Sequence, residues 1–392
     1  MKILNKAINK LAKNKLLLSK VSFSVYNLSM VVILNLFFSP EISGILLYKQ
    51  GLIFLLAGLS RLGSDFYWVS SENNVIISKK EIPFILVSTF LVSLFYVIFA
   101  ENFLFIDVFL VFISILLVNS LIFLGRLYQK SKKHIISLFI LTIAPTLLSV
   151  PLYWFFTDIN IFVVISLSMF IVLILLLIDL YRRNDLINIE RTDDSIFKRL
   201  NFFPMIIYGV LNQNLIQLFS GFSGRIEQSA LLLLFQRICS LVLWPQIFHM
   251  QTELNKIGNS LKNINAFDNY LINYLRKNLK ETLLYVSLII MIASYFFYSG
   301  KNQNSYLFIS FFIILLSSLI NLSLGFIQYQ IGLTKNGFKS IFVLLISLIF
   351  NISYINFFNS PYISIALVFL FFHTINHISN LYILRKYLKY DR

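Results

Sequence analysis

Three cations of this chain lie inside long apolar runs. Arg237 belongs to the run Ser229–Met250, and Lys49 and Arg61 belong to the run Ile42–Val69. At the centre of a bilayer a charged side chain costs at least about 2.5–3.5 kcal/mol on insertion scales, so it normally faces a water-filled cavity, a partner or the interior of a helix bundle. If these runs cross a membrane, each cation needs such an explanation.

Arg237 is the deepest of the three cations. Counted from Gln228 at 1.5 Å per residue, it lies about 13 Å into the membrane, too far for its side chain to reach the surface easily. Gln236, Ser240 and Trp244 share one broad side of the predicted helix with it. An ion pair with a carboxylate of another span is the alternative. Few carboxylates are available at that depth, so we favour a role in a cavity.

The run that contains Arg61 also carries a stripe of small and polar residues. The members of the stripe recur at helical spacing, and they are Gln50, Phe54, Ala57, Gly58, Arg61 and Asp65. We expect this face to meet protein or water. Arg61 and Asp65 are four residues apart, so a salt bridge near the membrane surface explains them as well as a role in transport does. Lys49 lies about 10 Å from the predicted outer end and could extend to the surface.

Amide side chains gather in the apolar run Phe202–Gly221. Gln213, Asn214 and Gln217 lie on one side of the helix predicted there. They could bind sugar hydroxyls. They could equally form hydrogen bonds between helices, which is a common use of Asn and Gln in membranes.

Two motifs that look like known binding sites are incomplete. In "HTINH", His373 and His377 are one helical turn apart, but the glutamate of a zinc-protease helix is absent. The stretch "GLTKNGFKS" has an extra residue before Lys339 and joins two apolar runs, whereas a phosphate loop joins a strand to a helix. We therefore expect no metal site, no nucleotide site and no cofactor.

The composition is that of an integral membrane protein. Of 392 residues, 58% are hydrophobic and 13% are charged, and the mean hydropathy is +0.80, far outside the range of a soluble domain. The 33 Lys and Arg, which give a net charge of +16, are spread among short connections, so we expect no nucleic-acid partner. The one cysteine, Cys239, lies in an apolar run and predicts neither a disulfide nor a thiol metal site.

Apolar runs of about 20 residues, long enough for a hydrocarbon core of about 30 Å, recur along the chain. We predict about twelve transmembrane helices, at Leu17–Phe38, Ile42–Val69, Pro83–Ala100, Phe103–Tyr128, Ile135–Phe156, Ile161–Tyr181, Phe202–Gly221, Ser229–Met250, Thr282–Tyr298, Tyr306–Gln328, Ser340–Phe357 and Ile363–Leu384. Lys and Arg fall almost entirely in alternate connections, which places both termini in the cytoplasm.

The longest predicted inner connections are Arg182–Asn201 and Gln251–Lys280. The first divides the chain into two halves of six helices, residues 1–200 and 201–392. "EISGILLYKQ" from Glu41 and "EQSALLLLFQ" from Glu227 share Glu, Ser, two Leu and Gln at matching positions. This similarity indicates an internal repeat of the kind that transporters use.

Stretches of both halves resemble the Wzx-type polysaccharide flippases, which share an exporter superfamily with the multidrug and toxic-compound extruders. "SPEISGILLYKQGLIFLLAGLSRLGSDFYWV" is similar to that family's second span, "LNQNLIQLFSGFSGRIEQSALLLLFQRICSL" to its seventh and eighth, and "IQYQIGLTKNGFKSIFVLLISLIFNISYINFF" to its tenth and eleventh. The resemblance implies an all-α polytopic protein of the bacterial inner membrane, with two six-helix bundles around a central cavity as in MATE-like exporters.

The resemblance also implies a function, the movement of an undecaprenyl-pyrophosphate-linked oligosaccharide across the inner membrane by alternating access. The residues implied for the substrate site share a cationic or amide side chain, and they are Arg237, Arg61, Lys49, Gln50, Asn214, Gln217 and Gln236. Cations would hold the diphosphate, which guanidinium groups bind with paired hydrogen bonds, and amides would contact the sugar hydroxyls. The expected partners are this lipid-linked oligosaccharide, membrane lipids and other membrane proteins of polysaccharide assembly.

Two other classes of protein share this composition. A polysaccharide polymerase or O-acyltransferase needs loops in which to build a catalytic site, and the predicted outer connections are only a few residues long. A multidrug exporter of the same superfamily is expected to carry carboxylates for cationic drugs, whereas cations outnumber acids in these spans, with Asp65 the clear exception. We therefore favour a transporter of an anionic substrate over an enzyme.

Overall fold

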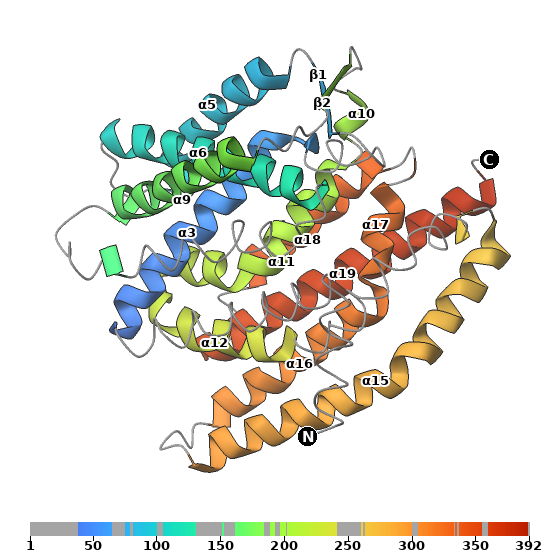
Figure 1. Ribbon diagram of the computed structural model, residues 1–392. Helices are drawn as coiled ribbons and strands as arrows, with labels where there is room; N and C mark the ends of the chain where they lie inside the picture. Colours follow the sequence, from blue (N-terminus) through green and yellow to red (C-terminus); the bar gives the residue numbers. More distant parts are fainter. Residues whose placement is uncertain are drawn as a thin grey trace, which may run out of the picture. The chain divides into compact units, whose positions relative to one another are not determined.

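The computed structural model describes residues 38–64, 75–78, 81–99, 105–130, 151–152, 161–183, 189–192, 197–200, 202–240, 260–261, 263–299, 305–332, 334, 337–354 and 360–390 (Figure 1). These residues are almost entirely helical, and two strands of four residues each are the exceptions. The predicted first and fifth spans lie outside the described residues, so the count of about twelve spans stays a prediction.

Within the described residues, five helices are long and apolar enough to cross a membrane. They are α3 (Pro40–Arg61), α6 (Phe105–Lys130), α16 (Ser305–Leu324), α18 (Ser340–Tyr354) with the short 3₁₀ turn η3 (Gly337–Lys339) before it, and α19 (Pro361–Tyr390). Two further apolar helices are α5 (Glu81–Phe99) and α9 (Ile161–Arg183). The prediction of a helical membrane protein is confirmed.

Large apolar side chains point outward from these helices. Ile82, Val87 and Phe90 of α5 are more than half exposed, as are Ile346 and Ile349 of α18. A soluble protein rarely exposes contiguous apolar patches of this size, whereas lipid tails cover such faces favourably. The opposite faces of α5 and α18 are buried against other helices. Each of these helices therefore has one face toward protein and one face suited to lipid.

The chain divides into two compact units, residues 1–214 and 215–392. The boundary falls within α11 (Phe203–Phe222), later than the predicted boundary after residue 200. The further prediction, that each half holds six helices around a shared cavity, is not addressed by this division and stays a prediction.

In the first unit, α3 packs against α5, α6 and α9, and α6 packs against both α5 and α9 (Figure 1). Ala57 and Gly58 of the predicted stripe are buried, and a Cβ on Gly58 would lie 3.1 Å from Val210 of α11. The expectation that this face meets protein is confirmed for these two residues, and small side chains let the helices approach closely.

Helix α3 begins at Pro40, where Ser39 accepts a hydrogen bond of 3.4 Å from the Ile42 N–H, and it ends at Arg61. Leu62 follows with a φ of 46° and Gly63 with a φ of 98°, both in the left-handed region, which breaks the helix. The predicted continuation to Val69 as one helix is therefore wrong. Asp65 lies outside the described residues, so its predicted pairing with Arg61 stays a prediction.

Two connections that the sequence predicts as loops pair with each other in the first unit. Strand β1 (Val75–Ser78) lies parallel to β2 (Ile189–Thr192), with Val75 opposite Ile189 and Ser78 opposite Thr192. Helix α10 (Phe197–Leu200) follows β2. The strands come from the segments after α3 and after α9, so this pairing ties together two distant connections at the predicted cytoplasmic end.

In the second unit, α19 is the common packing partner of α12 (Ile226–Cys239), α15 (Ile264–Ser299), α16, α17 (Phe326–Gly332) and α18. Aromatic and aliphatic side chains of α15, α17 and α19 form one buried cluster, whose members are Phe267, Tyr274, Phe326, Ile327, Ile331, Leu384 and Leu388.

Helix α15 begins at Ile264, inside the predicted inner connection Gln251–Lys280, so the second part of that connection is helical. The physical reason is an apolar stripe at helical spacing, with Ile264, Phe267, Leu271 and Tyr274 facing α17 and α19. The Tyr274 hydroxyl donates a hydrogen bond of 3.0 Å to the Leu322 carbonyl, and burial raises the pKa of that hydroxyl.

We expect Gly63→Ala to destabilise the protein. At a φ of 98° a side chain strains the backbone by about 1–3 kcal/mol, and the added Cβ would collide with the backbone carbonyl of Arg199. The measurement is the thermal unfolding midpoint of the purified chain in detergent, which should fall. Gly209→Ala is the matched control, because a Cβ there meets nothing within 4 Å and its midpoint should not fall. Equal midpoints for the two variants would contradict this account of the turn.

Candidate functional site

Arg61 lies at the end of α3, and its side chain is only 2% exposed. One guanidinium nitrogen, Nη1, donates a hydrogen bond of 2.8 Å to Oδ1 of Asn119 on α6. The Asn119 amide in turn donates to the hydroxyl of Ser60 at 2.9 Å and to that of Thr89 on α5 at 3.2 Å. Arg61 is thus held where α3, α5 and α6 meet. Its partner Asn119 is in turn held by the hydroxyls of Ser60 and Thr89.

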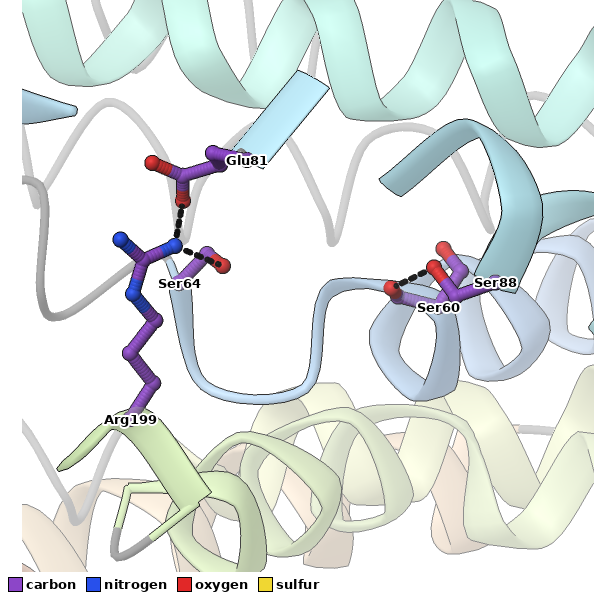
Figure 2. Close-up of polar contacts among 5 residues, drawn as sticks. All are labelled: Ser60, Ser64, Glu81, Ser88 and Arg199. Carbon is purple, nitrogen blue, oxygen red and sulfur yellow. Dashed lines mark hydrogen bonds and ion pairs between the residues drawn. The ribbon is translucent and has the colours of Figure 1, made fainter. Parts of the chain in front are cut away.

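Ser88 completes this polar cluster from α5. Its hydroxyl donates a hydrogen bond of 2.6 Å to the backbone carbonyl of Ser60, as Figure 2 shows. The last carbonyls of a helix have no partner within the helix, and a side chain from a neighbouring helix is one way to satisfy them. The C-terminal turn of α3 is therefore fixed in place together with the cation it carries.

A buried ion pair lies at the same end of the first unit. Nη1 of Arg199 on α10 lies 2.5 Å from Oε1 of Glu81, the first residue of α5, and 3.5 Å from the hydroxyl of Ser64 (Figure 2). Both charged side chains are 1% exposed. This pair joins the segment after α3, the start of α5 and the short helix before α11, and sequence reasoning did not predict it.

Lys49 lies on α3 nearer its N-terminal end. Its ammonium group is 4.7 Å from the centroid of the Phe162 ring on α9, a cation–π contact, and the carboxylate of Asp107 is near enough to attract it. Gln50 beside it is half-buried. Along the axis of α3, Lys49 and Arg61 are about 18 Å apart, so the two cations cannot bind the same phosphate group at the same time.

Of the three predicted amides of α11, Asn214 and Gln217 are buried, whereas Gln213 is exposed. Asn214 is 8% exposed, and its Nδ2 donates a hydrogen bond of 2.9 Å to the Val210 carbonyl one turn earlier. Gln217 is 4% exposed, and its Oε1 accepts no hydrogen bond within the described part of the chain. Gln217 therefore retains an acceptor for a ligand hydroxyl, whereas Asn214 already uses its donor locally.

Gln236 and Arg237 lie in the last turn of α12. Gln236 is 4% exposed, and Arg237 is half-buried. The Ser240 hydroxyl donates a hydrogen bond of 2.7 Å to the Arg237 carbonyl, and Trp244 lies outside the described residues. Arg237 and Gln236 belong to the second unit and Arg61 to the first, so their predicted convergence on one substrate stays a prediction.

Two polar groups of the structure were missed by sequence reasoning. One is Asn119, whose signal is a single amide in the middle of an otherwise apolar run. The other is a set of buried histidines and amides on α16, α18 and α19, among them His373 and His377. The motif that holds these histidines was considered only as a metal site.

We expect Arg199→Ala to lower the free energy of unfolding by about 3–5 kcal/mol, because Glu81 would remain as a buried charge without its partner. Restoring neutrality with the double variant Arg199→Met, Glu81→Leu should recover most of the loss. The measurement is the unfolding midpoint in detergent at equal protein concentration.

Arg385→Ala serves as the matched control for this prediction. Arg385 also forms an ion pair at 2.5 Å, with Asp268, but the two side chains are 47% and 37% exposed. An exposed pair contributes about 0–1 kcal/mol, so this variant should unfold close to the native midpoint. If the unfolding midpoint of Arg199→Ala were no lower than that of Arg385→Ala, the buried ion pair would not stabilise the fold as predicted.

No protein-family model matches this chain, and comparisons with curated proteins and with solved structures also find no match.

Proposed function

We propose that this protein is a flippase that moves an undecaprenyl-pyrophosphate-linked oligosaccharide across the bacterial inner membrane. The observation that carries the proposal is that guanidinium groups are kept within apolar helices, most clearly Arg61, which is 2% exposed and held between α3, α5 and α6. A cation inside a membrane helix is costly, so its presence favours a functional role, and its charge suits an anionic ligand. A lipid-linked diphosphate is an anion whose tail can remain in the bilayer.

The position of Arg61 suits an anion with paired oxygens, such as a diphosphate. Asn119 binds one nitrogen of the Arg61 fork, so the plane of the guanidinium is fixed before any ligand arrives. A pre-oriented guanidinium loses less freedom when it forms two parallel hydrogen bonds with phosphate oxygens. In the second unit, the buried acceptor of Gln217 separately suits a hydroxyl donor such as a sugar.

The separation of Lys49 and Arg61 along α3 supports movement of the anion. Because they are about 18 Å apart, they would meet the head group at different depths and not together. In alternating access, a substrate meets the groups near one side of the membrane and then those near the other. A sequence of cations along one helix would keep the diphosphate from crossing apolar surface without a counter-charge.

The connection between α11 and α12 supports transport over catalysis. It consists of Ser223, Gly224 and Arg225, and it is predicted to lie on the outer side. A polymerase or an O-acyltransferase normally builds its catalytic site from loops outside the membrane, and three residues are too few for that.

The test is complementation of a bacterial strain that lacks its own flippase, with surface polysaccharide as the readout. Arg237→Ala should reduce the amount of polysaccharide roughly 10- to 100-fold, because hydrogen bonds to a charged group are worth about 1.5–3 kcal/mol. Arg237→Lys should restore part of it, since the charge returns without the paired donors. Arg385→Ala, an exposed arginine of the same unit, should leave the amount unchanged.

All variants are compared at equal abundance in the membrane. Full activity of Arg237→Ala would make Arg237 structural and remove it from the substrate site. Failure of the native protein to complement with any of a panel of glycans would contradict the flippase assignment and favour an enzyme or a drug exporter.

A further inference from the structure

Three helices of the second unit form a membrane core without formal charge. Neither α16 nor α18 contains Asp, Glu, Lys or Arg, and α19 has its first cation only at Arg385, near its end. Helix α19 packs against both of the others. In the middle of this core lie two histidines and four asparagines, all of them buried: Asn321, Asn351, His373, Asn376, His377 and Asn380. We call this set the amide–histidine cluster.

The cluster is joined across helices by its own hydrogen bonds. Nε2 of His377 lies 3.2 Å from Oδ1 of Asn321 on α16, and the Asn376 amide donates a hydrogen bond of 3.0 Å to the hydroxyl of Ser347 on α18. The rings of His373 and His377 are stacked, with centroids 5.7 Å apart. Counted from Pro361, the two histidines are about 18 and 24 Å along α19, well inside a hydrocarbon core of about 30 Å.

Two asparagines at the edge of the cluster have unused polar atoms. Asn351 follows Ser347 by one turn of α18, and Asn380 follows Asn376 by one turn of α19, so both line the seam where Ser347 and Asn376 meet. Each is 0% exposed, and neither amide forms a hydrogen bond within the described residues. Buried polar groups in a membrane are normally satisfied, so this seam is built to receive a polar or charged species.

We propose that the amide–histidine cluster is a protonation site, at which the stacked pair of His373 and His377 takes up one proton from the aqueous phase and later releases it. The proposal rests on the proposed transport function and gives the cluster the role of coupling that transport to a proton gradient.

The chemistry of the cluster favours a proton over a metal ion. Among the described residues no group of three or more His, Cys, Asp and Glu is placed to hold a metal. A divalent cation would need anionic or several imidazole ligands, and α16 and α18 supply only amides and hydroxyls. Imidazole is the one side chain of the set with a basic nitrogen that can bind a proton, and free in water it changes charge between pH 5 and pH 8.

The stacked arrangement limits the pair to one proton. Two imidazolium rings 5.7 Å apart inside an apolar core would repel each other strongly, so the second protonation is opposed by the first. In the uptake step, a proton forms one N–H bond with an unprotonated ring nitrogen, and the pair changes from neutral to singly positive. Release breaks that bond and returns the pair to neutral, so no other reactant is needed.

The surrounding charges are few and lie on the other helices packed against α19. Helix α12 carries Glu227 and Arg237, α15 carries Asp268, Arg276, Lys277, Lys280 and Glu281, and α17 carries none. Asp268 is already paired with Arg385 of α19. The amide oxygen of Asn321 contacts His377 directly, and it can accept a hydrogen bond from a protonated ring.

The test uses the full chain in lipid nanodiscs, labelled with ¹⁵N-histidine and followed by NMR as the pH is changed. The chain has four histidines, and His373→Gln and His377→Gln assign the two of interest. We expect the pair to move from neutral to imidazolium resonances with uptake of one proton, and Asn321→Leu to shift the midpoint. Resonances that stay neutral over the whole pH range in which the protein remains folded would overturn the proposal, as would a response to sodium in place of protons.

A second measurement links the site to transport. The native protein is placed in proteoliposomes with a lipid-linked oligosaccharide from a strain that it complements. An imposed pH gradient should then stimulate transport of that oligosaccharide. The double variant His373→Gln, His377→Gln should lose that stimulation. Thr374→Ala, which changes a neighbouring side chain bonded to its own helix, should keep it. Stimulation that persists in the double variant would overturn the coupling role.

The two proposals fail in different ways. If no lipid-linked oligosaccharide is transported, the flippase assignment is wrong, and the NMR titration still decides whether the pair binds a proton. If the protein transports but the pair never titrates, the protonation site is wrong and the flippase assignment stands. The unfolding midpoints of the glutamine variants show separately whether either histidine is needed for folding.

Discussion

The constraint that governs this structure is that lipid supplies no hydrogen bonds, so each polar group inside an apolar helix needs a partner from protein. Many serines meet this need within their own helix, as Ser114 does with the Leu110 carbonyl. Others reach across, as Ser317 of α16 does to the Phe369 carbonyl of α19 at 3.2 Å. These bonds are individually worth about 1 kcal/mol or less, yet each one fixes which helix faces which.

The same constraint explains why α3 ends where it does. Leu62 and Gly63 leave the helix in left-handed conformations, and the open carbonyl of Ser60 is taken by Ser88 of another helix. Arg199, whose backbone carbonyl lies against Gly63, then places its guanidinium on Glu81. A turn, a helix end and a buried ion pair therefore lie together in one arrangement.

Local sequence signals predicted the helices of the described residues well and their ends less well. The apolar runs at α6, α9 and α11 were placed within a few residues, because hydrophobicity over twenty residues needs no tertiary information. The end of α3 was missed because Arg199, far away in sequence, lies against the turn at Gly63. The pairing of β1 with β2 was missed for the same reason, since two four-residue strands in basic connections carry no local sign of each other.

The candidate site shows a similar limit. Arg61 could be recognised from the sequence because a cation in an apolar run is conspicuous, but its contact with Asn119 depends on the rotation of α6 about its own axis, which hydropathy does not fix. The spacing of the histidines of α19 could be read from the sequence, but the contact of His377 with Asn321 of α16 depends on how the two helices pack.

The distribution of charge types has a consequence for how such a protein could work. The first unit holds a buried cation, Arg61, at the end of α3. Helices α16 and α18 of the second unit contain no Asp, Glu, Lys or Arg, and α19 carries two imidazoles, groups that can gain and lose a proton, before its first cation at Arg385. A fixed charge suits the binding of an anion in every transport cycle. A titratable pair suits a proton that is taken up and then released in the same cycle. Arg61 and the histidine pair lie in different helices, so a substitution near one need not change the environment of the other. Because either kind of charge is costly in a membrane, the presence of both supports two separate functions, anion binding and proton binding.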